Sequence, residues 1–392
     1  MVLVVTMQAG LLAPWLGAGR GAGDGIWLQA AFGAAYALAA CLLLVRWARR
    51  GRARASWWLL WPLAYLLLAT LSLTWSELPA LTARRVLALA GTLVFAVWVV
   101  ETMTPARMLR NAALGLATIA LLSVAMLAAT PRIAVHAEGT HVGSWRGALL
   151  HKNLLGREMA LATTLALGIA LAGPRGQRPA WLGLALVTAV LVVGARSATG
   201  LAVLAAGAAT VLFVSLPAVG ARERMGRRVV LGAALVAVVA AVAAFAAPAL
   251  EALGRDATLT GRDRIWQVTL AVLGERAWLG HGFGAFWEGT GGAAVSRELG
   301  YRVGHAHNGW LQALASLGVP GVALLATLWL ALVHHAWRAP GLAGVRAPLM
   351  GFAVHVGLLS LTDAVMSGPN SLSLTVALTA VLMAGARDRG GP

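Results

Sequence analysis

The sequence predicts an all-α fold, a polytopic transmembrane helical bundle of about 12 spans with a helical loop region between the ninth and tenth spans. Three observations support this prediction. The 392 residues are 59% hydrophobic and only 11% charged, whereas soluble domains are about 25% charged. Apolar runs of about 17–25 residues, the length that crosses a bilayer, recur along the chain. Connections rich in arginine separate many of these runs.

The predicted spans divide the chain into three parts. Residues 1–247 carry the first nine spans, residues 248–318 form the loop region with short amphipathic helices and the candidate catalytic motif, and residues 319–392 carry the last three. The first span is the weakest, because Gln8 and Pro14 interrupt it. The predicted ranges are 3–17, 26–45, 57–75, 82–101, 109–129, 156–172, 180–195, 200–216, 229–247, 319–337, 348–366 and 371–386.

The charge pattern predicts how the spans are oriented. The formal net charge is +17, but the basic residues lie between hydrophobic spans and form no single solvated face. We therefore expect them to set topology and to contact anionic membrane lipids, and we expect no nucleic-acid partner. Short basic connections such as 46–56, 104–110 and 221–228 belong in the cytoplasm by the positive-inside rule.

The opposite side of the membrane carries more cations than that rule predicts. An economical use for translocated cations is to bind an anion, and anions in membranes are mostly phosphates. Arginine suits a diphosphate, because its planar fork donates two aligned hydrogen bonds. These outer cations are Arg132, Arg146, Lys152, Arg157, Arg196, Arg255, Arg262, Arg264, Arg276, Arg297 and Arg302.

The stretch "VGHAHNGWLQALASLGVPG" places His305, His307 and Asn308 immediately before an apolar helix. The positive end of the helix dipole disfavours an imidazolium and lowers the histidine pKa. A neutral imidazole accepts a proton, as general base catalysis requires. The alternative is that both histidines sit at the membrane interface and bind water or lipid headgroups.

Three candidate phosphate ligands lie close to span ends. Arg196 occupies a very short outer hairpin, while Arg146 and Lys152 precede the span that begins near residue 156. Each can bind substrate phosphate. Each can equally anchor a helix end by extending to the interface.

Three further candidates lie late in the chain. Arg262 and Arg264 begin an amphipathic segment, where they either bind substrate or form a solvated helix start with Asp263. Asp363 lies near the outer end of a span, where an acid is a functional candidate by default. The alternative for Asp363 is a structural ion pair with an outer arginine.

The sequence predicts neither a metal nor an organic cofactor. No pair of outward acids shows ligand-like spacing, and H-x-x-x-H and D-x-D patterns are absent. A Walker motif and a dinucleotide fingerprint are also absent. A nucleotide donor is therefore not indicated.

Several motifs resemble the O-antigen ligase family, whose shared region also covers O-antigen polymerases and protein O-oligosaccharyltransferases. The "H-N-x-x-L-Q-x-L-x-x-L-G" pattern spans His307 to Gly318, and "G-R-x-x-I-W" spans Gly261 to Trp266. "WSELPAL", from Trp75 to Leu81, is similar to an outer loop of the family. Arg196 and Asp363 match the family's hairpin arginine and late acid, although here Ser197 follows the arginine instead of preceding it.

The resemblance implies a glycosyltransferase that needs no metal or nucleotide. The donor would be a glycan linked to undecaprenyl diphosphate and the acceptor lipid A–core oligosaccharide. The location would be the periplasmic face of the bacterial inner membrane. His307 would be the base, and Arg196 and Arg262 would stabilise the diphosphate. Supporting residues would be Arg146, Lys152, Arg264, His305, Asn308 and Asp363.

Other functions remain open on the sequence. Within the same family, the protein could be an O-antigen polymerase or a protein O-oligosaccharyltransferase. From a different class, it could be an anion transporter, with outer arginines at the entrance and His355 and Asp363 relaying protons. Transporter sites usually lie at mid-membrane between structural repeats, whereas here the charge gathers at one face and no repeat is visible.

Overall fold

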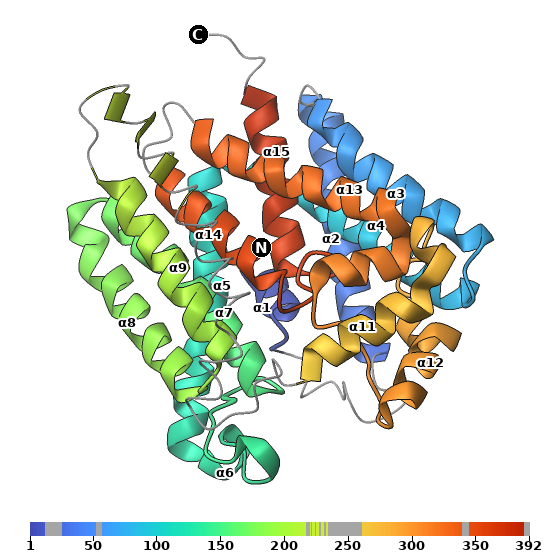
Figure 1. Ribbon diagram of the computed structural model, residues 1–392. Coiled ribbons are helices and arrows are strands. Elements are labelled where there is room, and N and C mark those ends of the chain that lie inside the picture. The colour runs from blue at the N-terminus through green and yellow to red at the C-terminus, as the bar shows by residue number, and fades with distance from the viewer. Residues whose placement is uncertain are drawn as a thin grey trace.

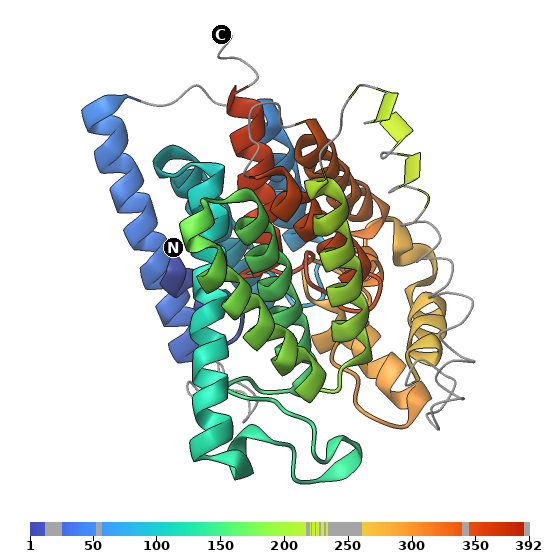
Figure 2. The same cartoon turned by 90° about the vertical axis from the view of Figure 1, so that its left-hand side faces the viewer.

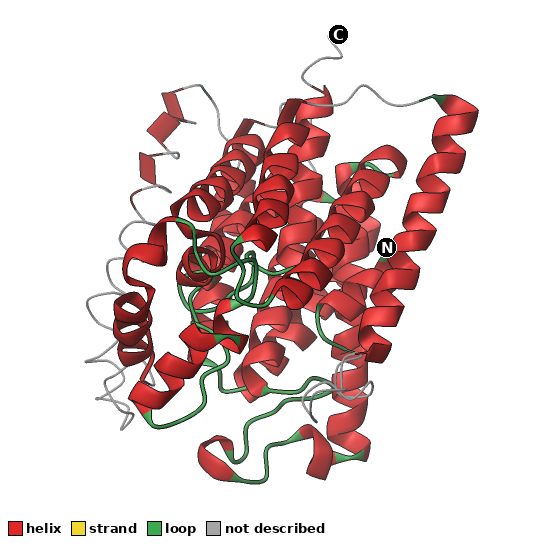
Figure 3. Ribbon diagram, turned by 90° about the vertical axis from the view of Figure 1, so that its right-hand side faces the viewer, coloured by secondary structure: helices red, strands yellow, loops and turns green. Residues whose placement is uncertain are grey.

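The computed structural model describes residues 1–11, 26–51, 57–216, 261–338 and 345–387, with isolated positions between 220 and 233. Helices make up nearly all the regular structure of these residues (Figures 1 and 3). Within them no β-strand is present, and one isolated bridge pairs Val135 with Trp145. The prediction of an all-α polytopic membrane protein is confirmed.

The N-terminal half is a series of long apolar helices joined by short connections. Pro79 and Pro105 each occupy the first turn of a helix, where a missing N–H does no harm. The elements are α1 (Val2–Gln8), α2 (Ile26–Arg50), η1 (Trp57–Leu59), α3 (Leu60–Leu71), η2 (Ser72–Thr74), α4 (Pro79–Thr102), α5 (Pro105–Ala129), α6 (Pro131–Ala134), η3 (Gly139–His141) and α7 (Lys152–Ala172).

The second half adds the helical loop region and, among the described residues, five more helices of 14 residues or longer. As Figure 1 shows, α11 and α12 lie at the lower right and α6 at the bottom, while α15 ends at the top. The elements are η4 (Arg175–Gln177), α8 (Arg178–Gly194), α9 (Ala198–Ser215), α11 (Arg262–Leu273), η6 (Gly274–Trp278), η7 (Phe286–Glu288), α12 (Thr290–Leu299), α13 (Gly309–Arg338), α14 (Arg346–Leu359) and α15 (Leu372–Arg387).

Seven described helices are long and apolar enough to cross a membrane, and three more apolar helices are shorter. Those seven and three correspond to ten of the twelve predicted spans. The predicted span 229–247 lies outside the described residues. Large apolar side chains on α2 face outward, and Figure 2 shows this helix at the edge of the bundle. Lipid contact explains this exposure, because a membrane-spanning helix needs no apolar protein partner on its outer face.

The first predicted span needs a correction. Helix α1 has 7 residues, or about 10 Å at 1.5 Å per residue, and a turn follows at once. Gly10 has φ +90°, which ends the helix, and the Gln8 amide donates to the hydroxyls of Thr375 (2.8 Å) and Tyr36 (3.3 Å). A continuous span over residues 3–17 is therefore wrong for its described part, and residues 12–17 lie outside the description.

Helix α7 is the central helix of the bundle, and several predicted site residues lie at or near its N-terminus. It packs against α8, α9, α5 and α14, and 72% of its most apolar 18-residue stretch is buried inside the protein. Small residues allow these close approaches: a Cβ on Gly156 would lie 2.7 Å from Ser197, and one on Gly168 would lie 2.6 Å from Pro348. The N-terminus of α7 is thereby held beside the hairpin that carries Arg196.

Helix α13 is broken at Gly318, where the sequence predicts that a short helix ends before the next span begins. Gly318 has φ 65° and ψ −162°, and a Cβ there would lie 2.1 Å from the carbonyl oxygen of Trp278. The loop after Trp278 therefore crosses close to the backbone of α13 at the break. The break separates a short first segment, which carries the histidines at its start, from the spanning part of α13.

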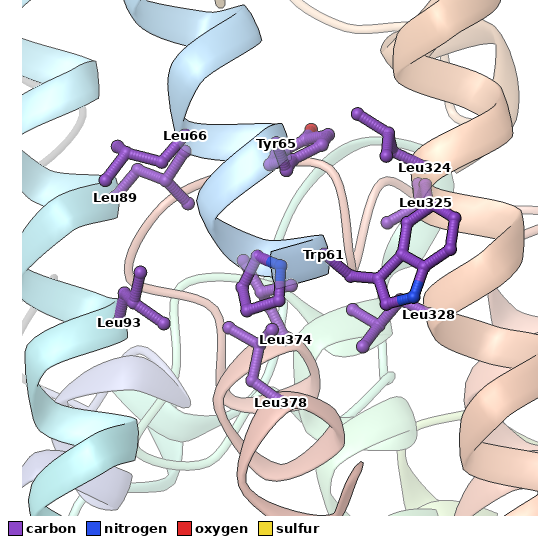
Figure 4. Close-up of a pocket in the computed structure, with 11 residues that line it drawn as sticks. Trp61, Tyr65, Leu66, Leu89, Leu93, Leu324, Leu325, Leu328, Leu374 and Leu378 are labelled. Carbon is purple, nitrogen blue, oxygen red and sulfur yellow. The ribbon is translucent and has the colours of Figure 1, made fainter. Parts of the chain in front are cut away.

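An apolar pocket of about 430 Å³, including open space at its mouth, lies between α3, α4, α13 and α15. Figure 4 shows Tyr65 and Trp61 among leucine side chains that line it. Among the described residues, none of the predicted site residues lines this pocket. Its lining is almost entirely apolar, and the predicted site residues lie elsewhere.

Candidate active site

The segment that carries His305 and His307 is fixed from three directions. The indole N–H of Trp266, on α11, donates to the carbonyl of Ala306 at 2.8 Å. The backbone N–H of Ala306 donates to the side chain of Gln312 on α13 at 3.3 Å. The backbone N–H of Gly309 donates to the carbonyl of Ser360 at 2.8 Å. The segment is therefore pre-organised by α11, α13 and the residues after α14.

Asn308 has a structural task. Its side-chain oxygen accepts from the backbone N–H groups of Trp310 (3.0 Å) and Leu311 (3.1 Å), the pattern of a helix N-cap. The residue before it, His307, has φ 50°. This left-handed conformation costs about 1 kcal/mol or more in a residue with a Cβ, and the surrounding hydrogen bonds hold it in place.

The rings of His305 and His307 lie against each other, with centroids 3.8 Å apart and planes at 45°. Burial lowers the pKa of His307 to about 4, and His305, Arg262 and His151 lower it further while Asp363 opposes them. Burial also lowers the pKa of His305, again against the pull of Asp363. Both rings are therefore uncharged near neutral pH, as the sequence predicts, although burial contributes more than the neighbouring charges.

Arg262 is the first residue of α11, and its side chain extends towards the segment after α14, near His305 and His307. Its guanidinium Nη1 donates to the carbonyl of Thr362 at 3.1 Å, and its charge lowers the pKa of both histidines. Gly261, immediately before it, has φ 78°, a conformation that favours glycine. The turn before α11 thus directs Arg262 towards the segment after α14.

Asp363 pairs with Arg157, a residue for which the sequence reasoning proposed no specific role. The guanidinium of Arg157 bonds the Asp363 carboxylate and, at 3.0 Å, the carboxylate of Glu158. Burial would raise the pKa of the Asp363 carboxyl, but Arg157, the N–H of Ala364 and His305 together hold this pKa below its usual range. The ion pair fastens α7 to the residues after α14, which also accept hydrogen bonds from Gly309 and Arg262.

We expect Arg157→Gln to destabilise the fold by about 3 kcal/mol, because it leaves the largely buried Asp363 carboxylate without its cation. Thermal unfolding in detergent measures the effect. Adding Asp363→Asn should recover much of the loss, since a neutral amide needs no counter-charge. Arg264→Gln, which breaks an exposed ion pair with Glu298, should change stability by less than about 1 kcal/mol. A double variant no more stable than Arg157→Gln would contradict the pairing.

A second group of cations, formed by Arg146, Lys152 and Arg196, lies near the N-terminus of α7. The Lys152 ammonium, at the N-terminus of α7, donates to the carbonyl of Arg196 at 3.2 Å. Arg196 has φ 49°, and its guanidinium lies over Gly143, whose Cβ would be 3.2 Å from Nη1. Arg146 donates from Nε to the carbonyl of Ile133 at 2.6 Å. His151, next to Lys152, is near enough to lower the pKa of His307, so the two groups border one polar region.

Arg264 has a different partner from the other candidates. Its guanidinium Nη2 lies 3.7 Å from the Glu298 carboxylate on α12, and both side chains are more than half exposed. The pKa shifts of His305 and His307 do not involve it. Arg262 and Arg264, two residues apart, therefore point to different surroundings.

The outer loop that begins at Trp75 has a structural role. The Glu77 carboxylate accepts from the backbone N–H (3.0 Å) and hydroxyl (2.7 Å) of Thr290 and from Arg276 (2.8 Å). The Trp75 indole donates to the carbonyl of Leu279 at 3.2 Å. These contacts bind the start of α4 to the helical loop region.

In the described part of the chain, no group of three or more His, Cys, Asp or Glu side chains is arranged to hold a metal ion. The polar region instead combines uncharged imidazoles with guanidinium groups and one ammonium. Chemically, this arrangement can bind an anion and accept a proton beside it.

Comparisons with known proteins agree with the motifs. A family profile described as O-Antigen ligase matches residues 181–326, a range that contains Arg196, Arg262 and His307. The chain is also 29% identical over 280 residues to the exopolysaccharide production protein ExoQ of Rhizobium meliloti. The aligned region covers 68% of this chain and 62% of the ExoQ length.

Proposed function

We propose that this chain, whose residues 181–326 match the O-antigen ligase family profile, transfers a glycan from undecaprenyl diphosphate to an acceptor sugar at the periplasmic face of the bacterial inner membrane. The acceptor we favour is lipid A–core oligosaccharide. The observation that carries the proposal is that the segment after α14 binds both Arg262, through Thr362, and Gly309, two residues after the neutral, partly buried imidazole of His307.

In the proposed reaction, His307 accepts the proton of the acceptor hydroxyl as its oxygen attacks the anomeric carbon. The new glycosidic bond forms as the bond from that carbon to the diphosphate oxygen breaks, so the configuration inverts. The electron pair of the broken bond stays on undecaprenyl diphosphate, which therefore becomes more negatively charged. Arg262 and Arg196 stabilise that developing charge, as preorganised cations do, and the proton leaves His307 to solvent.

The surrounding residues have positioning and binding roles in this proposal. Asp363, held by Arg157, orients the segment after α14 that receives Arg262 and Gly309. His305 packs against the ring of His307. Lys152 and Arg146 lie in the second cationic group, where phosphates of the donor or of the acceptor can bind.

A growing polysaccharide chain is the second candidate acceptor. The similarity to a protein named for exopolysaccharide production favours it, because chain extension uses the same donor chemistry with a different hydroxyl. A pilin-like protein is the third candidate.

Transfer by purified protein to defined acceptors tests the proposal. The protein in detergent is mixed with glycan on undecaprenyl diphosphate and, in separate reactions, with lipid A–core, a glycan repeat or an acceptor protein. Mass spectrometry of each acceptor then identifies the product. Transfer to lipid A–core alone supports a ligase, whereas extension of the glycan repeat identifies a polymerase. Failure with every acceptor, together with anion uptake into sealed vesicles, would overturn the proposal in favour of transport.

The pH dependence of transfer follows from the lowered pKa of His307. Only the unprotonated ring is a base, so the contribution of His307 to kcat/KM should be constant near neutral pH and fall as the pH drops through about 4. In kcat the fall should occur at a higher pH, since bound diphosphate offsets Arg262 and raises the pKa. Initial rates between about pH 3 and pH 8 give both profiles. A fall of kcat/KM centred near pH 6.5 would mean that the free enzyme exposes His307 to solvent.

A further inference from the structure

Three of the nine histidines gather in the loop between α5 and α7. Their ring centroids lie 5.8 Å apart for His136 and His141, 5.2 Å for His136 and His151, and 5.0 Å for His141 and His151. The rings meet edge to face, and the triangle lies beside Lys152. The proposed transfer step uses none of these three imidazoles.

Backbone hydrogen bonds fix which nitrogen of two rings carries the proton. His136 Nε2 accepts from the backbone N–H of Lys152 at 3.3 Å, and His151 Nδ1 accepts from that of Asn153 at 3.2 Å. A neutral imidazole has one acceptor nitrogen and one N–H donor. Neutral His136 therefore carries its proton on Nδ1, and neutral His151 carries it on Nε2.

This arrangement suits an anion better than a metal ion. A metal ligand must offer a nitrogen lone pair, and in both rings the lone pair is engaged by the backbone. What each ring has left to offer is an N–H, which a phosphate oxygen accepts. This agrees with the absence of a metal-binding arrangement among the described residues.

The charges around the triangle are mostly positive. The charges of Arg146 and Lys152 lower the pKa of His136, and that of Lys152 lowers the pKa of His151. His151 in turn lowers the pKa of His307. Burial is the first cause that lowers the pKa of both rings, to about 4 for His151. The elements around the loop carry further charged or titratable side chains. These are Arg132 on α6, Arg196 between α8 and α9, Arg157 and Glu158 on α7, and His305 before α13.

Carboxylates do not balance these cations locally. Glu138 is the one acid between residues 131 and 151, and it is exposed. Glu158 is engaged by Arg157. The cations beside the triangle therefore favour an anion, and a bound anion favours protonation of the rings.

We propose that His136, His141 and His151 form, with Lys152, a proton-coupled subsite for a phosphate group beside the transfer site. The inference rests on the proposed function for its ligand, which is a phosphate of either the lipid-linked donor or a phosphorylated lipid acceptor. Ring N–H groups donate to the phosphate oxygens on arrival. The negative charge then draws further protons from solvent onto the rings, so that binding strengthens as the pH falls.

Anion titration of the purified full-length protein in zwitterionic nanodiscs tests the subsite. The probes are inorganic phosphate and sulfate, the latter because it stays a dianion between pH 6.0 and 7.5. Calorimetry in buffers of different ionisation enthalpy counts the protons taken up. We expect proton uptake and tighter sulfate binding at pH 6.0, by up to about tenfold per pH unit for each proton. Absence of binding, or binding without proton uptake, would overturn the subsite.

Two variants keep the backbone hydrogen bonds while removing the titrating group. His151→Asn retains an acceptor for the Asn153 N–H, and His136→Gln retains one for the Lys152 N–H. Each should weaken anion binding by roughly tenfold and reduce proton uptake. The matched control is His334→Gln, an exposed histidine in the last turns of α13, which should bind as wild type does. Unaltered binding in both triangle variants would also overturn the subsite.

Transfer kinetics then identify the source of the phosphate. A raised KM for a phosphorylated acceptor, but not for its dephosphorylated form, assigns the subsite to the acceptor, and a raised donor KM assigns it to the donor. Unchanged KM for both would overturn the assignment to substrate. If wild-type protein transfers glycan but the His136 and His151 variants bind anions as wild type does, the subsite is wrong and the proposed function stands. If proton-coupled anion binding occurs without any transfer, the proposed function fails instead.

Discussion

His307→Ala is expected to reduce glycan transfer by about 10²–10⁴-fold, the usual contribution of a general base, while donor binding is retained. The reason is that the ring supplies the acceptor for the sugar proton, whereas the guanidinium of Arg262, which would hold the diphosphate, is anchored independently by the carbonyl of Thr362. Single-turnover rates with donor in excess, together with a separate donor-binding measurement, distinguish the two contributions.

His307→Asn provides the matched variant. Asparagine tolerates the left-handed backbone that His307 adopts at φ 50°, but its amide is no base. Loss of transfer in both variants with normal thermal stability would identify the lost base, because the backbone strain differs between them. Near-normal turnover of His307→Asn would contradict the proposed role.

Local patterns in the sequence predicted the helical architecture and the break in α13. Apolar runs of membrane length give helices directly, since a bilayer leaves few other structures for the backbone. The "LGVPG" stretch marked the end of the short helix, and Gly318 indeed has a non-helical backbone. The first span was wrong in its described part, because hydropathy does not register that Gln8 bonds Thr375 near the other end of the chain.

The candidate site was partly predictable for a related reason. His305, His307, Arg262 and Asp363 stand out as polar residues beside apolar segments, and the structure brings them together. Arg157 and Glu158 carried the same signal, an ion pair within the first turns of a spanning helix, but sequence separation hid the partner Asp363, which lies 206 residues away.

The histidine triangle was the harder part to predict. Singly, His136, His141 and His151 are typical loop residues, and their spacing matches no metal motif. Backbone hydrogen bonds between His136 and both Gly143 and Ser144 fold the loop back on itself, and the N–H of Trp145 bonds Gly194 at the end of α8. Arg264 shares a short motif with Arg262, but the helix turns it towards Glu298, so its role in substrate binding stays a prediction.

Arg262→Ala is expected to weaken donor binding and to slow transfer together, with a loss of about 10–150-fold in kcat/KM. This range corresponds to roughly 1.5–3 kcal/mol for a hydrogen bond from a charged group. The effect should appear in both KM and kcat, because the diphosphate is already charged before reaction and becomes more so as the leaving group departs. Steady-state kinetics with varied donor give the two parameters.

Two comparisons show whether the geometry of this arginine matters. Arg262→Lys keeps the charge but loses the planar fork, so it should recover only part of the activity. Arg264→Ala removes an equal charge two residues away, where the side chain is exposed and paired with Glu298, and should lose much less. Equal losses at the two arginines would mean that the donor responds to a diffuse positive field, and the contact of Arg262 with the segment after α14 would then have no special role in binding it.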